Sequence, residues 1–444
     1  MSRKTITAII CISASFFAIA QNVTGSWEGK LKFGGASDLR VVFNLKDNGK
    51  SVSFDSPDQG AFGIPGEVKY NSGDSISISI SRIGMEYNGK LKSGILSGML
   101  SQGLAKLPLE LTPKTSEMKR PQTPVAPFPY TTEEVTFCNP EGAQGGATLT
   151  GTLTLPEKSL KNTPVVLMVS GSGQQNRDEE LFGHKPFAVI ADYLARNGIA
   201  SLRYDDRGTG GSTGDVADAT TYDFSKDAAA GIKWLRDNHR FGRVGVLGHS
   251  EGGLIAFMIP SDFIVTLGAP AVRGDSILRY QSEEALAKSG VSPSLAGEYG
   301  EALIRLYETI SQKGAQYAVE NIDKICGWED NPTHNMLKNN LKRIAVSDNK
   351  WLNTFASFSP SNYIMALKNK PALILYGEKD TQVAPELNEA PIRKMARKAD
   401  IRVYPGLNHM MQHCITGEIN EYADIEETIS PEVLSDIVKF IKTL

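Results

Sequence analysis

The stretch that most constrains the fold of this chain is residues 243–254, which read RVGVLGHSEGGL. The apolar run at 244–247 is typical of a fully buried parallel strand, and the small and apolar residues 253–259 favour a buried helix. Glycines between these two runs let the strand and the helix approach each other closely. We therefore predict a strand, a tight turn and a helix, with Ser250 strained at the turn and its hydroxyl pointing outward.

A second Gly-x-Ser-x-Gly at residues 210–214 shows that the pentapeptide alone is a weak signal. It lies six residues beyond the preceding apolar run, and Asp215, Asp218 and a threonine pair follow it instead of a buried helix. We therefore expect Ser212 to be a loop serine, and only Ser250 to have the context of a nucleophile.

Length and charge limit the class of protein. The chain has 444 residues, enough for two or three domains, and a net charge of −3 without a basic block, which argues against a nucleic-acid partner.

Arg3 and Lys4 precede an apolar run at 6–19 that ends in Ala-Ile-Ala, so we predict a secretory signal peptide over residues 1–20. The run is short for a membrane span, so we expect an exported protein, periplasmic or extracellular, without stable membrane insertion after cleavage. Its oligomeric state stays open.

Three widely spaced cysteines would remain after cleavage, namely Cys138, Cys326 and Cys414. At most one disulfide can form among them, so the chain is not a disulfide scaffold. No His and Cys residues have the spacing of metal ligands, and we expect neither a metal nor another cofactor.

Residues 21–112 have the pattern of a small antiparallel β domain, either a barrel or a sandwich. The expected strands, separated by Asn- and Gly-containing turns, are residues 27–33, 39–45, 51–54, 66–70 and 75–81. Residues 113–130 contain five prolines and predict an extended, semi-rigid linker that marks the domain boundary.

Strands alternate with helices in residues 131–444, which implies a mostly parallel sheet with helices on both faces. Together with the turn at Ser250, this alternation predicts an α/β-hydrolase fold. An insertion at about residues 271–370 has helical character without strands. Because it lies between two core strands, we expect it to form a helical cap over the site.

A serine hydroxyl becomes a nucleophile when a neutral imidazole takes its proton and a carboxylate orients that imidazole. In this fold the order along the chain is serine, acid, histidine. Asp380 follows a buried strand in a Gly-x-x-Asp turn, and His409 lies shortly after the last predicted strand. We predict Ser250, Asp380 and His409 as catalytic residues, with Glu378 and His413 as their nearest rivals.

Two backbone N–H groups should stabilise the oxyanion in such a site. One is expected from Glu251, the residue after the nucleophile. The other is expected from the glycine-containing loop at 171–174, where Ser172 and Gly173 both stay candidates.

Several motifs of residues 131–444 occur in a fixed order: GSGQ at 171–174, HKPF at 184–187, RYDDRG at 203–208, GHSEGG at 248–253, GEKD at 377–380 and GLNH at 406–409. In this combination the chain resembles the exported bacterial carboxylesterases of the α/β-hydrolase superfamily, a serine peptidase-like group with an N-terminal β domain. The resemblance implies Ser250, Asp380 and His409 as the triad. It also implies that Asp205, Asp206 and Arg207 brace loops around the site. Residues 175–176 depart from the pattern of the group at the rim of the site.

The sequence therefore predicts a secreted serine hydrolase that cleaves small-molecule carboxylic esters. A peptidase or aminopeptidase on the same fold is the first alternative, and a ligand-binding protein that uses the β domain is the second. We expect the cap to set substrate choice through Trp351, Phe355 and Phe358. The competing interpretation is that these aromatic residues only fasten the cap to the core.

Overall fold

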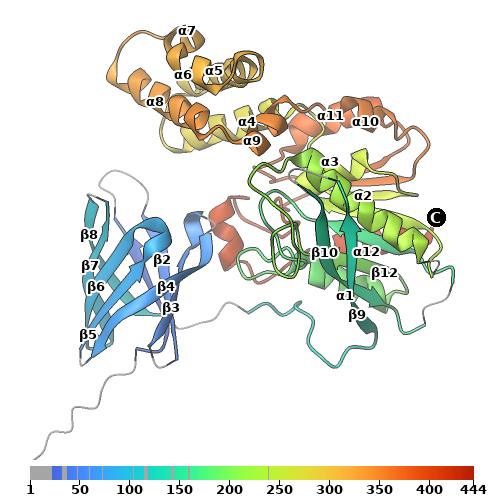
Figure 1. Ribbon diagram of the computed structural model, residues 1–444, viewed down its shortest axis with the longest axis horizontal. Coiled ribbons are helices and arrows are strands. Elements are labelled where there is room, and N and C mark those ends of the chain that lie inside the picture. The colour runs from blue at the N-terminus through green and yellow to red at the C-terminus, as the bar shows by residue number, and fades with distance from the viewer. Residues whose placement is uncertain are drawn as a thin grey trace, which may run out of the picture. The chain divides into compact units, whose positions relative to one another are not determined.

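The structure is a computed structural model of the chain. It describes residues 23–32, 38–47, 49–59, 61–72, 74–103, 105–114, 119–141, 145–158, 161–238 and 240–444. The predicted signal peptide lies outside these residues. The chain divides into two compact units, Met1–Glu117 and Met118–Leu444, and Figure 1 shows their elements.

The first unit is a closed antiparallel barrel, which decides between the two β architectures expected from the sequence. Its strands follow one another around the barrel in chain order: β1 (Gly25–Leu31), β2 (Leu39–Lys46), β3 (Ser51–Ser56), β4 (Ala61–Ser72), β5 (Ser75–Ile80), β6 (Met85–Lys92), β7 (Ile95–Gln102) and β8 (Ala105–Pro113). Two short 3₁₀ helices, η1 (Pro57–Gln59) and η2 (Ser81–Ile83), follow β3 and β5. Closure is made by β1 and β8, which pair through Trp27 and Pro113.

Apolar side chains fill the barrel because alternate residues of each strand point inward. Phe43 and Tyr87 are fully buried, with ring centroids 5.4 Å apart. The Tyr87 hydroxyl donates to the carbonyl oxygen of Leu96 at 3.0 Å, so its one polar atom is satisfied within the core. Burial raises the pKa of Tyr87 well above its usual range.

The second unit contains an eight-stranded sheet with the order β16-β15-β14-β13-β11-β12-β10-β9. The strands are β9 (Thr131–Asn139), β10 (Ala147–Leu155), β11 (Val165–Val169), β12 (Ala200–Tyr204), β13 (Val244–His249), β14 (Ile264–Leu267), β15 (Ala372–Gly377) and β16 (Asp400–Tyr404). The β9–β10 and β10–β12 pairs are antiparallel, and the pairs from β12 to β16 are parallel. This topology is that of an α/β-hydrolase, as the sequence predicts.

Helices cover both faces of this sheet. The apolar side chains of α2 (Thr221–Asp237), α3 (Glu251–Met258) and α11 (Pro385–Met395) belong to one core cluster. Those of α1 (Pro186–Arg196) and α12 (Pro431–Lys442) belong to the cluster on the opposite face. The carboxyl ends of the parallel strands are left for loops, which is where active sites form in such sheets.

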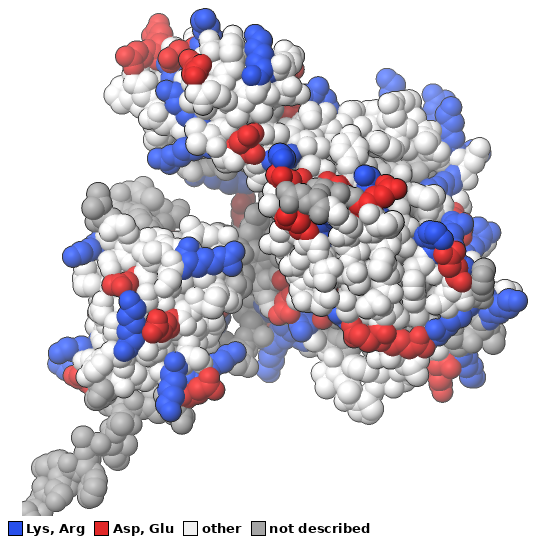
Figure 2. Space-filling model, viewed as in Figure 1, with Lys and Arg blue, Asp and Glu red and all other residues white. Residues whose placement is uncertain are grey.

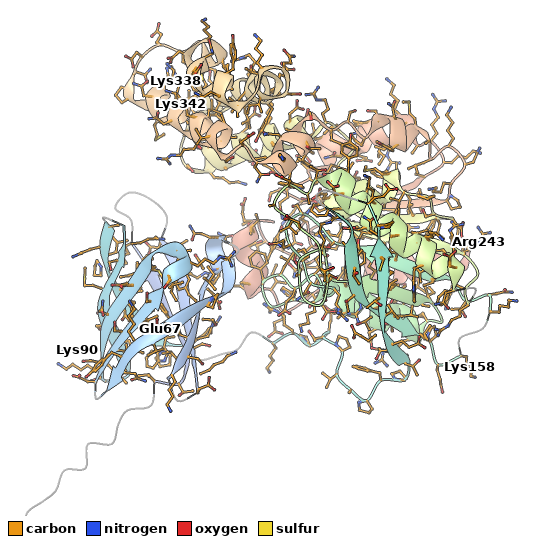
Figure 3. All side chains as sticks on the ribbon, in the orientation of Figure 1. Glu67, Lys90, Lys158, Arg243, Lys338 and Lys342 are labelled. Carbon is orange, nitrogen blue, oxygen red and sulfur yellow. The ribbon has the colours of Figure 1, made fainter. Side chains whose placement is uncertain are left out.

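The insertion between β14 and β15 is helical, as predicted. It consists of α4 (Gly274–Lys288), α5 (Pro293–Lys313), α6 (Ala315–Glu320), α7 (Ile322–Cys326), α8 (Pro332–Ser347), α9 (Lys350–Ser357) and α10 (Ser361–Met365). A small apolar cluster holds it together, with Leu306 and Leu341 fully buried. Lys338 and Lys342 both extend from α8 (Figure 3), and Lys338 Nζ lies 2.8 Å from Asp323 Oδ1.

The proline-rich segment 119–130 is fastened to the second unit by two side chains. Arg120 donates to the carbonyl oxygens of Phe182, Ala423 and Ile425 at 2.8–2.9 Å. The Gln122 side-chain amide forms three hydrogen bonds with the backbone at Thr428 and Ile429. Its nitrogen donates to the Ile429 carbonyl oxygen, and its oxygen accepts from the N–H groups of Thr428 and Ile429. This part of the predicted linker therefore belongs to the second unit.

Three further properties of the described residues bear on the sequence predictions. Cys138, Cys326 and Cys414 are free thiols. Within the described ranges, no helix combines the length and apolar character that crossing a membrane requires. On the face of the molecule shown in Figure 2, lysine and arginine side chains are interspersed with aspartate and glutamate.

Candidate active site

Ser250 sits at the turn between β13 and α3 with φ 52° and ψ −119°, a strained conformation for a residue with a side chain. Arg243 lies just before β13 (Figure 3), and its carbonyl oxygen accepts from the Val165 amide at 2.9 Å. A Cβ on Gly248 would lie 2.1 Å from the Gly252 oxygen, and one on Gly252 only 2.0 Å from the Val169 oxygen. Both positions therefore require glycine, and the turn has the geometry of a nucleophile elbow.

Ser212, in the other Gly-x-Ser-x-Gly, has a structural role. Its Oγ donates to the Asp205 carbonyl oxygen at 2.7 Å and accepts from the Thr150 amide at 2.9 Å. Its φ is not positive. A buried hydroxyl with both roles occupied ties a loop to the sheet and is not available for attack.

The structure brings Asp380 and His409 together at the carboxyl ends of β15 and β16. Asp380 Oδ2 lies 2.7 Å from His409 Nδ1, and both side chains are almost fully buried. Oδ1 of the same carboxylate accepts from the amides of Gln382 and Val383 at 2.9 and 2.7 Å. These bonds fix the carboxylate, which in turn orients the imidazole and leaves its Nε2 without a hydrogen-bond partner among the described residues.

The two nearest rivals point elsewhere. Glu378 accepts from the Gly406 amide at 2.9 Å in an exposed position. His413 Nδ1 lies 2.8 Å from Glu427, and the His413 side chain is 64% exposed. Neither residue reaches the buried pair.

Ser250 and His409 both lie next to the backbone at Leu267 and Gly268. The Ser250 amide donates to the Leu267 oxygen at 2.8 Å, and a Cβ on Gly268 would lie 2.8 Å from His409 Nδ1. Among the described residues no hydrogen bond joins Ser250 Oγ to His409. Catalytic hydrogen bonds are often long in a free enzyme and shorten when substrate is bound.

The loop at 170–175 is held by two carboxylates. Asp206 accepts from Ser170 Oγ and from the Gln175 amide, both at 2.9 Å, and Glu179 Oε1 accepts from the Gly171 amide at 2.6 Å. Within the described part of the chain, the amides of residues 172–174 keep no hydrogen-bond partner, and these include the predicted donors Ser172 and Gly173. A Cβ on Gly171 would lie 3.2 Å from Ser250 Cβ, so this loop passes directly beside the nucleophile elbow.

Glu251, the other predicted amide donor, opens α3, and its side chain is buried beneath the cap. Its Oε1 accepts from Thr221 Oγ1 at 2.6 Å and from Trp351 Nε1 at 2.9 Å. Burial raises the pKa of Glu251, although these two hydrogen bonds oppose the shift. The contact with Trp351 ties helix α9 to the residue that follows Ser250.

A cavity of about 630 Å³ opens between the 170–175 loop and α9. Its lining combines the loop, an apolar wall and the start of α9: Ser172, Gly173, Gln174, Val216, Ala217, Ala219, Phe224, Ser347, Asp348, Asn349, Lys350 and Trp351. The three aromatic residues predicted to select the substrate therefore separate. Trp351 lines the cavity, whereas Phe355, on the same helix α9, and Phe358, which follows that helix, are buried in the core cluster.

The residues expected to brace the loops do so. Asp205 binds Arg177 through both oxygens at 2.8–3.1 Å, and Arg207 makes a fully buried pair with Asp227 at 2.7–2.8 Å. Sequence reasoning missed Glu179, which precedes α1 in a polar loop without a recognisable pattern. His249 was also not among the predicted site residues, and its position next to Ser250 was the one available signal.

Comparisons with known proteins show what the chain is similar to. Residues 145–350 match the sequence model of the X-Pro dipeptidyl-peptidase (S15) family. The chain is 26% identical over 291 residues to esterase EstD of Thermotoga maritima, over 61% of this chain and 59% of that protein. The chain thus covers less than two thirds of this relative.

Solved structures with a similar arrangement include three bacterial or archaeal proteins. An esterase of Pyrococcus furiosus superposes with a TM-score of 0.42 at 17% identity, over 74% of this chain and 98% of that one. A hypothetical protein of Pseudomonas aeruginosa gives 0.46 at 18%, over 74% and 98%. A proline iminopeptidase of Mycobacterium smegmatis gives 0.41 at 16%, over 70% and 98%. The sheet topology and the elbow at residue 250 give the chain the α/β-hydrolase fold, and its sequence is similar to that of an esterase and to the S15 peptidase family model.

Proposed function

We propose that this chain hydrolyses carboxylic esters through an acyl-enzyme, with Ser250 as nucleophile, His409 as general base and Asp380 as the acid that orients His409. The observation that carries the proposal is the buried 2.7 Å contact between Asp380 and His409 beside a serine with a positive φ. Such a constellation performs acyl transfer on several unrelated folds because each group has a chemical task.

The first half of the reaction acylates the serine. His409 Nε2 takes the proton of Ser250 Oγ while Oγ bonds to the ester carbonyl carbon. The developing oxyanion accepts from the Glu251 amide and from an amide of the 172–173 pair, which the braces at Asp206 and Glu179 leave without partners. Collapse of the tetrahedral intermediate breaks the bond to the leaving oxygen, which receives the proton from His409.

The second half hydrolyses the acyl-enzyme by the same groups. Water gives a proton to His409 Nε2 as its oxygen attacks the acyl carbon, and the intermediate collapses when the proton returns to Ser250 Oγ. No step requires a group beyond the chain and water.

The cavity is lined by the proposed oxyanion donors Ser172 and Gly173, although not by the three catalytic residues, and its charges favour esters over peptides with a free amino terminus. An aminopeptidase needs carboxylates to bind the substrate ammonium. Among the described lining residues the charged side chains are Asp348 and Lys350, which have opposite signs, and Lys350 is paired with Asp218 at 2.8 Å. The apolar wall with Phe224 and Trp351 suits an acyl or aryl group of moderate size. A peptidase stays the second candidate function, because residues 145–350 match the S15 family.

We also propose that the enzyme acts outside the cytoplasm. The proposal rests on the charged start and the apolar run within residues 1–20. Expression in a bacterial host should give a mature protein that begins near residue 21 and is recovered outside the cytoplasm. An uncleaved protein in the cytoplasmic fraction would contradict it.

The test of activity is a panel of p-nitrophenyl esters of increasing acyl length beside aminoacyl and X-Pro p-nitroanilides. We expect ester turnover to exceed anilide turnover, and Ser250→Ala to lower kcat by about 10³-fold or more. Ser212→Ala is the matched control and should stay near wild type. Faster cleavage of X-Pro anilides would favour the peptidase, and a fluorophosphonate adduct on a serine other than Ser250 would overturn the assigned nucleophile.

A further inference from the structure

His249, which directly precedes Ser250, is buried with both ring nitrogens in contact with oxygen. Nδ1 lies 2.8 Å from Glu179 Oε1, and Nε2 lies 3.1 Å from the carbonyl oxygen of His409. The same Glu179 oxygen accepts from the Gly171 amide at 2.6 Å. One imidazole and one carboxylate therefore join three segments: the 170–175 loop, the nucleophile elbow and the loop of the base.

These contacts fix how many protons the pair holds. A carbonyl oxygen only accepts, so Nε2 carries a hydrogen when it bonds to His409. One further hydrogen must lie between Nδ1 and Glu179 Oε1 for that contact to attract. If this shared proton is lost, the lone pairs of nitrogen and oxygen face each other and the connection to the 170–175 loop is broken.

The buried pair of His249 and Glu179 is unfavourable for the stability of the folded state. The side chains of His249 and Glu179 are 8% and 1% exposed, so charges there lose their hydration. Glu179 Oε2 is buried without a hydrogen-bond partner, and Glu179 has a φ of 50°, in the left-handed region. Unsatisfied atoms and strained backbone of this kind gather at functional sites, where the surrounding structure holds them in place.

We propose that Glu179 and His249 are positioning residues, and that their shared proton holds the amide donors and the base in register with Ser250. The inference rests on the proposed function, because it assigns the 170–175 loop to the oxyanion. Neither residue touches the substrate. Their effect on the rate is exerted through Gly171 on one side and His409 on the other, where a displacement of 1 Å costs up to about 10²-fold.

The charged groups around the pair determine when the proton is lost. Asp380 faces His249 from the loop after β15, and Asp206 and Glu179 face each other from neighbouring loops, with Glu251 close by on α3. Burial lowers the pKa of His249, but the charge and hydrogen bond of Glu179, the carbonyl of His409 and the charge of Asp380 together raise it by more, so that the net shift is upward. Loss of the shared proton therefore requires a higher pH than loss of a proton from a free histidine.

Glu179→Gln tests the proposal, with Glu180→Gln as matched control because Glu180 is exposed and, in the described part of the chain, forms an ion pair with Lys185 alone. Glutamine keeps the acceptor for Gly171 but removes the charge that stabilises a doubly protonated imidazole, so one of the two contacts of His249 fails. We expect kcat for p-nitrophenyl acetate at pH 8 to fall by about 10- to 100-fold with little change in KM. The ratio of variant to wild-type kcat should rise as the pH is lowered, because acid restores the second proton.

A merely structural role predicts a different result. If Glu179→Gln lowers Tm while its pH–rate profile stays parallel to that of the wild type, the proposal is wrong. The protonation of His249 is measured without turnover by ¹⁵N NMR of histidine-labelled protein, with its signals assigned from His249→Gln. A ring with a single N–H beside an ionised Glu179 carboxylate at pH 7, read from the ¹³C shift of that carboxyl, overturns the inference whatever the substrate. A shared proton in a protein that turns over no ester contradicts the proposed function alone.

Discussion

The barrel and the second unit, here called the hydrolase unit, differ in the kinds of polar side chain that they bury. Among the described residues of the barrel, the buried polar groups are uncharged and include the hydroxyls of Ser56, Ser79 and Tyr87. The hydrolase unit buries many charged or titratable groups, and several lie around one turn: Glu179, Asp205, His249, Glu251, Asp380 and His409. Burying such groups is unfavourable unless each is paired, so their concentration marks where the chain performs chemistry.

The comparison assigns stability to one unit and reactivity to the other. The alternation of inward and outward side chains along each strand is sufficient to explain the apolar interior of the barrel. It also argues against the alternative in which the barrel is a ligand carrier, since the described inward side chains, such as Phe43 and Tyr87, fill the interior themselves.

Asp380→Asn should have the largest effect on turnover, because it removes the charge that orients the base. An amide at this position keeps the shape but holds His409 in the wrong tautomer, so kcat should fall by about 10⁴-fold while the fold is kept. Ester turnover and thermal unfolding of the purified variant measure the two properties. Glu378→Gln is the control, because Glu378 contacts Gly406 at the surface. If Asp380→Asn leaves kcat nearly unchanged while Glu378→Gln lowers it strongly, the acid is wrongly assigned.

Phe43→Ala should produce the converse result in the barrel. Its ring is fully buried and lies 5.2 and 5.4 Å from those of Phe54 and Tyr87. Losing it should destabilise the barrel by about 3–5 kcal/mol, since a cavity remains where the ring was. Calorimetry should show an earlier transition with kcat unchanged at temperatures where the barrel is folded. Tyr70→Ala, at a 53% exposed position, is the control, and a fall in kcat that follows barrel unfolding would break the division of roles.

The sequence predicted the parts of the molecule that depend on local patterns. Strand, turn and helix around Ser250, the order Ser250, Asp380, His409 and the helical insertion all follow from periodicity and chain order. The strands β6, β7 and β8 were not among those predicted, although β6 alternates between buried and exposed residues. Glycine within β6 and β7 interrupts the apolar pattern, and only pairing with neighbouring strands completes them.

Contacts between distant segments could not be predicted in this way. Glu179 reaches His249 from 70 residues away, and Trp351 reaches Glu251 from 100 residues away. Neither pair has a spacing that periodicity can detect, because tertiary folding alone brings the partners together. The sequence also could not divide Trp351 from Phe355, since both belong to one short apolar helix and differ only in what that helix faces.

Trp351→Ala and Phe355→Ala sharpen that division within the hydrolase unit. Trp351 lines the cavity, so its removal should change the ratio of kcat/KM between long and short acyl esters by about 10-fold. Phe355 is buried and stacks on Trp351 at 5.7 Å, so its removal should lower Tm and leave the ratio nearly unchanged. If both variants lower Tm and neither changes the ratio, Trp351 only fastens the cap.

The smallest effect concerns pH. Burial raises the pKa of Asp206 to about 8, although the Gln175 amide and the Ser170 hydroxyl oppose the shift. Between the ordinary aspartate pKa near 4 and this value, the folded state binds a proton that the unfolded state does not, so stability falls as pH rises. Asp206→Asn keeps an acceptor for both donors and removes this dependence. We expect the Tm of the variant relative to wild type to increase by a few degrees between pH 5 and pH 9.

Asp205→Asn, one residue away, is the matched control because its shift has the opposite sign. Burial raises the pKa of Asp205, but hydrogen bonds from Arg177 and Gly211 lower it by more, so its net value lies below the ordinary one. Its contribution to stability is present above the unfolded pKa and is lost only at more acidic pH. From pH 5 to pH 9 the Tm difference of Asp205→Asn should therefore stay constant while that of Asp206→Asn grows. The buried hydroxyls of the barrel do not titrate in this range. Equal slopes of the Tm difference for the two variants would show that Asp206 is ionised in the folded protein and that its pairing resembles that of Asp205.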